Sequence, residues 1–212
     1  EDNYGSAFAG KYDSVFLANQ GSPEERLAAL EDAVRTVYAS AMSPDALTYR
    51  QTRGLAEADE QMAILVQRVS GDHHGSLFFP HAAGVANSSN LYTWDAGVDS
   101  EAGMLRLVIG MGTRAVDRTT TDHARIVALD DPLRGRLSDA EDLSAHSQRR
   151  VDAIDVATNA FTTVRLDSLA GTDVRADWSL FVSPDTAVLR RLAERERGSG
   201  RRPSGPPPIV AD

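Results

Sequence analysis

Cysteine is absent from the 212-residue sequence, and this absence limits both the chemistry and the compartment of the protein. Without cysteine the chain has no disulfide bond, no thiolate nucleophile and no cysteine metal site. The absence agrees with a reducing compartment, so we expect the cytoplasm. No apolar run approaches the length of a membrane-spanning helix, so we expect no membrane partner.

Lysine is nearly absent as well, because Lys11 is the only one and the other cationic side chains are arginine. A mechanism that needs a catalytic lysine therefore has a single candidate. Arginine stays protonated, and its guanidinium group binds phosphate or carboxylate with two parallel hydrogen bonds. Acidic residues are in excess and give a formal net charge of −9, which disfavours nonspecific binding to nucleic acid.

Three serine-proline signals predict helix starts. Ser22-Pro23-Glu24-Glu25 combines an N-cap serine, a proline at the first helical position and a capping-box glutamate. The apolar positions that follow recur every three or four residues, as on one face of a helix. Ser43-Pro44-Asp45 and Ser183-Pro184-Asp185 repeat the start signal. The predicted helices cover about residues 23–41, 44–54 and 184–197.

Apolar segments predict strands in the middle of the chain, so the fold class is α+β. MAILVQRV, residues 62–69, is a continuous apolar run that turns polar at its end, which is typical of a buried strand that emerges at a sheet edge. Further strands are predicted at 83–87, 104–109 and 124–129, and a β ribbon at 151–156 and 161–169.

The GDHHG segment at 71–75 is expected to be a turn with exposed histidines. A metal site at His73 and His74, with His81 nearby, is the alternative, but no third ligand has a convincing spacing.

The first thirteen residues, EDNYGSAFAGKYD, hold a glycine among small side chains. Because Gly10 has no Cβ and its φ is unrestricted, backbone N–H groups there can approach a polyanion closely, and Lys11 adds a positive charge. The residues alone fit an ordinary glycine turn equally well.

Five segments resemble the ATP-grasp nucleotide-binding domain of phosphoenolpyruvate synthases and pyruvate, phosphate dikinases. SAFAGK resembles the family's Ser-Phe-Ala-Gly-Gln/Lys segment, which covers the triphosphate. VYASAMSPDALTYR (37–50) resembles its helix pair, and MAILVQRVS (62–70) resembles its Val-Gln hinge strand. AAGVANSSN (82–90) and VIGMGTRAVD (108–117) resemble two further stretches, the second of which reads Gly-Leu-Gly-Glu in the family. The resemblance covers about residues 1–130.

The resemblance implies an ATP-grasp-like mixed sheet with flanking helices, and a phosphotransferase domain that uses ATP and Mg²⁺. In the family, a histidine on a separate swivelling domain attacks ATP, so that domain and the PEP/pyruvate domain of the full-length enzyme are the implied partners. The expected organisation is a partial nucleotide-binding region at 1–130 that lacks its upstream part, an extension at 131–197 and a flexible linker at 198–212. The isolated fragment is expected to be inactive, and the final phosphoryl acceptor stays open.

The resemblance implies that two segments of this chain contact the phosphates and the adenine of ATP. The resemblance puts Gly10 and Lys11 against the ATP phosphates. It makes Gln67, with the backbone of Arg68 and Val69, face adenine. An edge backbone supplies the donor and the acceptor that adenine requires.

The resemblance also suggests phosphate and metal ligands. Arg50 and Arg125 are candidate phosphate or lid arginines, with a surface ion pair as the alternative for each. Where relatives have a glutamate after Gly-Leu-Gly, this chain has Thr113, a weaker ligand than a carboxylate. Thr113 and Asp117 are therefore the candidate metal ligands, with Asp122 as another source of charge.

Two other interpretations remain open. The domain can be a non-catalytic nucleotide-binding or structural relic, because Thr113 replaces the glutamate. Alternatively, the predicted strand at 105–109 followed by Gly110-Met-Gly-Thr-Arg-Ala115, with Asp130 twenty positions on, fits a Rossmann dinucleotide fingerprint. The residues at 116–123 are too few and too rich in threonine for the helix which that motif requires.

Overall fold

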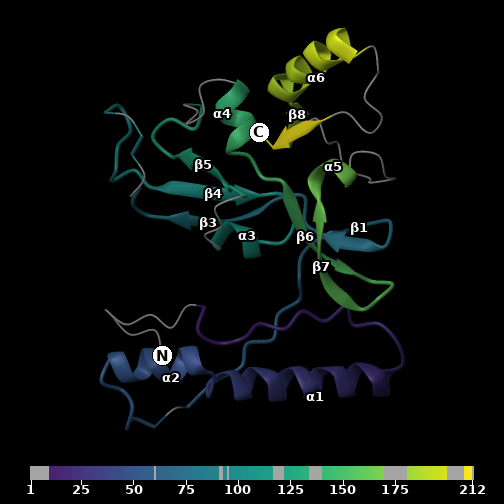
Figure 1. The fold of residues 1–212 in the computed structure, drawn as a ribbon. Coiled ribbons are helices and arrows are strands. Elements are labelled where there is room, and N and C mark those ends of the chain that lie inside the picture. Colours follow the sequence, from purple (N-terminus) through teal and green to yellow (C-terminus); the bar gives the residue numbers. More distant parts are fainter. Residues whose placement is uncertain are drawn as a thin grey trace. The chain divides into compact units, whose positions relative to one another are not determined.

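The computed structural model of the chain consists of helices and antiparallel strand pairs (Figure 1), which confirms the predicted α+β class. It describes residues 10–59, 61–90, 93–94, 96–116, 122–133, 140–169, 181–199 and 208–211. The chain divides into two compact units: one extends to Val69 and includes Thr158–Ala160, and the other comprises Ser70–Ala157 and the chain from Phe161 onward. Among the described residues, no helix is long and apolar enough to cross a membrane.

In the first unit, two helices begin at the predicted signals. α1 (Pro23–Ser40) follows Ser22, whose hydroxyl accepts a hydrogen bond from the Glu25 amide at 3.2 Å. The Ser22 amide in turn donates to the Glu25 carboxylate at 2.7 Å, which completes the capping box. α2 (Pro44–Thr52) follows Ser43, whose hydroxyl accepts an amide hydrogen bond of the first turn at 3.2 Å. Because these serines satisfy amides that the helix itself leaves open, local sequence fixes both helix starts, as predicted.

Residues 62–69 differ from the prediction of a buried strand, because they form neither a strand nor a helix. Leu65 is 78% exposed and Val66 is 69% exposed, so the predicted burial is also wrong. A strand needs a neighbouring strand to pair with its backbone, and residues 10–59 and 61–69 contain none. The apolar run is therefore an exposed, irregular segment.

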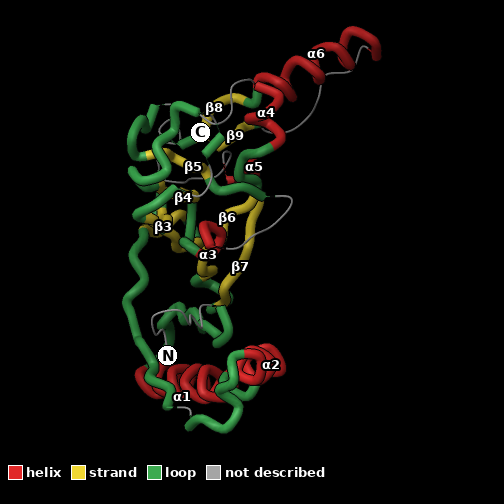
Figure 2. Tube along the Cα trace, turned by 90° about the vertical axis from the view of Figure 1, so that its left-hand side faces the viewer, coloured by secondary structure: helices red, strands yellow, loops and turns green. Residues whose placement is uncertain are grey.

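The second unit contains a four-stranded sheet with the order β1-β2-β6-β7, of which Figure 2 shows β6 and β7 side by side. β1 (Asp72–His74) pairs antiparallel with β2 (Leu77–Phe79), which pairs antiparallel with β6 (Arg150–Asp155). β7 (Ala160–Arg165) lies beside β6, which confirms the predicted ribbon. The turn predicted at 71–75 is wrong for the residues of β1, because their backbone pairs with β2.

A second sheet has the order β3-β4-β5 and confirms three predicted strands. β3 (Ala83–Asn87) and β5 (Arg125–Ala128) both pair antiparallel with β4 (Met104–Val108). The first and last residues of β4 are at most 4% exposed, so this strand contributes to the core. Short helices follow β4, β5 and β7, namely α3 (Thr113–Val116), α4 (Ala140–Ala145) and α5 (Leu166–Leu169).

The last elements of the chain are α6 (Thr186–Ser199), which confirms the third predicted helix, and a small sheet of β8 (Val182–Pro184) and β9 (Ile209–Ala211). The strand at β9 differs from the linker expected at 198–212. α6 begins two residues later than the Ser183 signal predicts, because Ser183 and Pro184 belong to β8. Asp185 is the N-cap and accepts a hydrogen bond from the Val188 amide at 2.9 Å.

A buried glutamine connects the end of β4 to the start of β6. Gln148 is 3% exposed, and its side-chain oxygen accepts a hydrogen bond from the Ile109 amide at 2.8 Å. Its side-chain nitrogen donates to the carbonyls of Ile109, at 2.8 Å, and Arg150, at 2.7 Å. The side-chain amide thus pairs with main-chain groups as a neighbouring strand would. It joins the two sheets at the start of the loop Gly110–Gly112, which we call the glycine loop.

Candidate functional site

Gly10 and Lys11, the predicted phosphate contacts, lie in the first unit. Gly10 is exposed with a φ of +71°, and an added Cβ would meet no atom of the described residues within 4 Å. The Lys11 ammonium lies 5.3 Å from the centroid of the Tyr49 ring, and the Arg53 guanidinium lies 5.2 Å from the same centroid. Both contacts are cation–π interactions. Lys11 and Arg53 thus place two positive charges at the Tyr49 ring, and Lys11 directly follows Gly10 in the sequence.

The predicted adenine contacts lie in the exposed, irregular segment of the same unit. Gln67 and Arg68 are exposed, and Val69 is half-buried. Because no strand includes these residues, their backbone groups are not engaged in a sheet. Their contact with adenine stays a prediction.

Arg50, a predicted phosphate contact, is buried in α2 with 8% of its surface exposed. Its guanidinium donates hydrogen bonds to the carbonyl of Leu55, at 3.3 Å, and to the carbonyl of Ala58, at 2.5 Å. These carbonyls belong to the segment that follows the helix, so Arg50 holds that segment against α2. The structure thus shows that Arg50 holds this segment, and its contact with phosphate stays a prediction.

Arg50→Ala is expected to loosen the segment after α2 and to cost about 1–3 kcal/mol, because two partly buried carbonyls lose their charged donor. Amide hydrogen exchange of residues 46–58 measures the effect locally, where faster exchange is expected. Arg35→Ala is the control: its ion pairs to Glu31 and Asp32 are exposed, so little change in stability or in exchange is expected. Equal exchange in the two variants would refute the assignment.

The other predicted phosphate and metal ligands belong to the second unit, except that Asp117 lies outside the described residues. Arg125 is the half-buried first residue of β5 and pairs with Leu107 of β4. Thr113 is the first residue of α3. The predicted site residues therefore fall in two groups, one in each compact unit.

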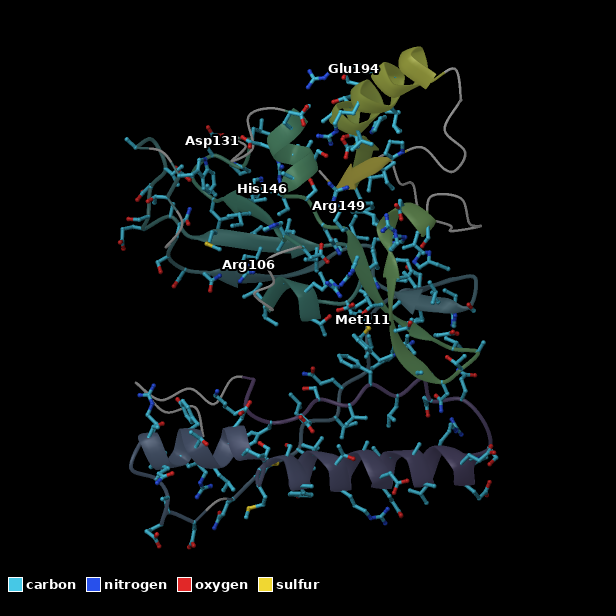
Figure 3. All side chains as sticks on the ribbon, viewed as in Figure 1. Arg106, Met111, Asp131, His146, Arg149 and Glu194 are labelled. Carbon is cyan, nitrogen blue, oxygen red and sulfur yellow. The ribbon has the colours of Figure 1, made fainter. Side chains whose placement is uncertain are left out.

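The glycine loop between β4 and α3 is fixed to β6 through its backbone. Gly110 has a φ of +90°, and its amide donates to the Pro80 carbonyl at 3.2 Å. The Met111 amide donates to the Asp152 carbonyl at 2.9 Å, and the Met111 side chain lies beside β6 and β7 (Figure 3). Because protein carbonyls already occupy these two amides, the loop is held as part of the core.

These bonds decide against the Rossmann interpretation of the same loop, which is wrong here. A dinucleotide fingerprint needs a parallel strand-helix-strand unit and loop amides directed at the pyrophosphate. β4 instead pairs antiparallel with both of its neighbours, and α3 spans only Thr113–Val116.

A buried carboxylate on β6 collects the side chains that follow the glycine loop. Asp152 is 4% exposed. One of its oxygens accepts a hydrogen bond from the Thr113 hydroxyl at 2.7 Å. The other accepts from Arg114 Nε at 2.8 Å and from the Thr163 hydroxyl at 2.6 Å. We call Asp152, Thr113, Arg114 and Thr163 the Asp152 cluster.

Arg114 extends this cluster to a second acidic residue. Its terminal nitrogen donates to Asp122 Oδ2 at 2.6 Å, and Asp122 Oδ1 accepts from the Arg149 amide at 2.6 Å. The Asp122 side chain is 5% exposed and that of Arg114 is 16% exposed, so the ion pair is shielded from solvent. The Arg149 side chain, which lies between α4 and β6 (Figure 3), donates to the Ser144 carbonyl.

The Asp152 cluster was not predicted from the sequence. Its central residue lies on the buried strand β6, 39 positions from Thr113, and only the fold brings the two together. The available signal was an acidic residue inside the apolar VDAID segment, because a buried carboxylate requires donors. Thr113 and Asp122 were predicted from the resemblance, and the structure connects both of them through Arg114.

The described residues do not by themselves fit a Mg²⁺ site. They contain no group of three or more histidine, aspartate or glutamate side chains that could hold a metal ion. The Thr113 hydroxyl donates a hydrogen bond to Asp152, and Arg114 places a positive charge beside the carboxylates of Asp122 and Asp152. The Asp152 cluster therefore holds the glycine loop in position.

A comparison with known families defines the class of the domain. Residues 1–173 match the family model described as pyruvate phosphate dikinase, AMP/ATP-binding domain. The chain is thus an ATP-binding domain of the kinase type. It belongs to the pyruvate phosphate dikinase AMP/ATP-binding domain family, which confirms the resemblance and extends it past residue 130 to the end of β7 and beyond. No curated protein and no solved structure matches the chain.

Proposed function

We propose that this domain positions ATP for phosphoryl transfer to a histidine on a separate domain. The match to the family over residues 1–173 carries the proposal, because that family binds AMP or ATP in an enzyme of the dikinase type. In this role the domain supplies orientation and charge, and the nucleophile comes from its partner. The histidine domain and the PEP/pyruvate domain of the full-length enzyme are the proposed partners.

The proposed nucleotide contacts lie in the first unit. Gly10 and Lys11 approach the phosphates, which the open surface of the glycine and the charges at Tyr49 support. Gln67, Arg68 and Val69 present backbone groups to adenine, a role that their position outside any strand favours. Arg125 is a further proposed phosphate contact.

Calorimetric titration of the chain with ATP tests the phosphate contact. Gly10→Ala is expected to weaken ATP binding about tenfold, which corresponds to about 1.4 kcal/mol. Gly54→Ala is the matched control, because Gly54 has a φ of +70° and Gly10 one of +71°, and neither glycine has an atom within 4 Å of an added Cβ. Both variants carry the same backbone strain, so a loss of affinity in Gly10→Ala alone reports on the nucleotide. Equal ATP affinity in the two variants would count against the contact.

A second candidate function is nucleotide binding without phosphoryl transfer. The observation that favours it is the hydrogen bond from Thr113 to Asp152, which engages the residue that stands where relatives have a glutamate. Titration with and without Mg²⁺ separates the two candidates. The phosphotransferase is expected to bind ATP more tightly with Mg²⁺, whereas the non-catalytic domain is expected to show equal affinities.

A further inference from the structure

His74 has an unusual environment for a polar side chain. The residue is 4% exposed, and neither ring nitrogen makes a hydrogen bond of good geometry with the described residues, although the Phe79 backbone lies near the ring. Its ring stacks against that of Phe79, with 4.1 Å between the centroids. This finding corrects the expectation that the histidines of GDHHG are exposed, which is right for His73 but wrong for His74. A buried polar group without a partner costs free energy, so it calls for a physical explanation.

A second histidine lies next to His74 and shares this property. His81 Nε2 is buried and has no hydrogen-bond partner among the described residues. Its other ring nitrogen, Nδ1, lies 3.9 Å from Asp72 Oδ2. A carboxylate at one ring nitrogen orients an imidazole and leaves the opposite nitrogen to bind a metal. The Phe181 ring stacks on His81, with 6.0 Å between the centroids, and further restricts the ring.

The separation of the two rings fits a shared ion. The centroids of His74 and His81 are 5.1 Å apart, and the ring planes are inclined at 74°. Two imidazoles bound to one tetrahedral Zn²⁺ through bonds of about 2.0–2.1 Å have their centroids about 5 Å apart. The His81 side chain is 36% exposed although its Nε2 is buried, so the pair lies just beneath the surface.

We propose that His74 and His81 form a two-histidine site for a transition-metal ion such as Zn²⁺. No set of three or more metal-ligating side chains converges among the described residues, so water completes the coordination. Imidazole nitrogen favours Zn²⁺, Cu²⁺ and Ni²⁺ over Mg²⁺, so this site is distinct from any ion that accompanies ATP. The site is independent of the proposed function, and neither depends on the other.

The protonation state of His74 supports the site. Burial lowers the pKa of His74, and the nearby His81 acts in the same direction. The backbone of Phe79 and then the carboxylate of Asp72 oppose this lowering of the His74 pKa, and His73 adds to it. At neutral pH the ring is therefore uncharged, which is the form that binds a metal ion.

Calorimetric titration of the EDTA-treated and dialysed chain with Zn²⁺ tests the site. We expect one saturable site with a Kd on the order of 10 µM, weaker than sites with four protein ligands. His74→Phe keeps a ring of similar size beside Phe79, and His81→Gln changes the more exposed ring. Each variant is expected to weaken binding at least about tenfold. Far-UV circular dichroism confirms that each variant is folded, and if His74→Phe does not fold, His81→Gln decides.

Two controls distinguish this pair from other histidines. His73→Gln changes the exposed neighbour on β1 and is expected to leave Zn²⁺ affinity unchanged. The double variant His123→Gln and His146→Gln removes the other histidine pair, whose centroids are 5.3 Å apart, and is also expected to have no effect. The proposal is overturned by an absence of saturable binding in the unaltered chain. Binding that survives both His74→Phe and His81→Gln, or that is lost in a control, would also overturn it.

Discussion

Asp152→Ala is expected to lower the free energy of unfolding of the second unit by about 3–5 kcal/mol, among the largest effects of any single substitution in this chain. The physical reason is that three donors lose their acceptor at once. Arg114 Nε and the hydroxyls of Thr113 and Thr163 all bond to this carboxylate within 2.8 Å. Thr113 and Arg114 are half-buried, so water replaces their lost bonds only in part, whereas the exposed Thr163 can bond to water.

Urea unfolding followed by tryptophan fluorescence measures this effect, because both tryptophans, Trp94 and Trp178, follow Ser70 in the chain. Asp155→Ala on the same strand is the control. Its carboxylate accepts a hydrogen bond from the Ala157 amide at 2.9 Å in an exposed turn, so a loss of at most about 1 kcal/mol is expected. Similar losses in the two variants would show that the Asp152 cluster contributes nothing special to stability.

The outcome at Asp152 also bears on function. A large loss of stability, with ATP affinity unchanged at a temperature where the variant is folded, would assign Thr113 and Asp152 to the positioning of the loop alone. That result would agree with the non-catalytic candidate. A loss of ATP affinity in the folded variant would connect the loop to nucleotide binding and favour the phosphotransferase.

Gly110→Ala is the second substitution with a large expected effect, a loss of about 2–4 kcal/mol. An alanine at a φ of +90° is strained. Its Cβ would also lie 2.5 Å from Val151 Cγ1 and 2.8 Å from the Asp152 carbonyl oxygen, closer than such atoms can approach. The loop would have to move away from β6, which would weaken the hydrogen bond between Met111 and Asp152.

Gly112→Ala is the matched control within the same loop. An added Cβ there would meet only Ala83 Cβ, at 3.6 Å, an ordinary van der Waals contact. We therefore expect a change within about 1 kcal/mol, of either sign. Thermal unfolding of the two variants, followed by circular dichroism, makes the comparison. If Gly112→Ala proves as harmful as Gly110→Ala, close packing against β6 is not what requires glycine at position 110.

The sequence predicted those elements whose signals are local. Ser22 and Glu25 form the capping box within one turn of the chain, so the start of α1 could be inferred from neighbouring residues. The strands β3, β4 and β5 followed from short apolar segments between turn residues. The family could be inferred for the same reason, because its motifs are contiguous strings.

The prediction of a strand at 62–69 was wrong because apolar residues indicate that a segment can be buried, but they do not supply the neighbouring strand with which its backbone must pair. The prediction for His74 was wrong in the opposite sense, because the residue was expected to be exposed and is buried. Two adjacent histidines between glycines are typical of an exposed turn, yet pairing with β2 buries one of them. Of the residues in the Asp152 network, the resemblance singled out Thr113 and Asp122 for a metal site, a role that stays a prediction, and neither Asp152 nor the partnership of His74 with His81 was predicted. These contacts join residues that are distant in sequence or lie on different elements.

By itself, the sequence determined the starts of α1 and α2, most of the strands, the α+β class and the family of this protein, because each depends on neighbouring residues or on a contiguous motif. The tertiary structure alone decided which polar groups are buried and what they contact. Asp152 receives Thr113 and Arg114 because β6 passes the glycine loop, and Arg50 faces carbonyls because the chain folds back after α2. Burial and hydrogen-bond partners depend on every element that surrounds a residue, and no local pattern contains that information.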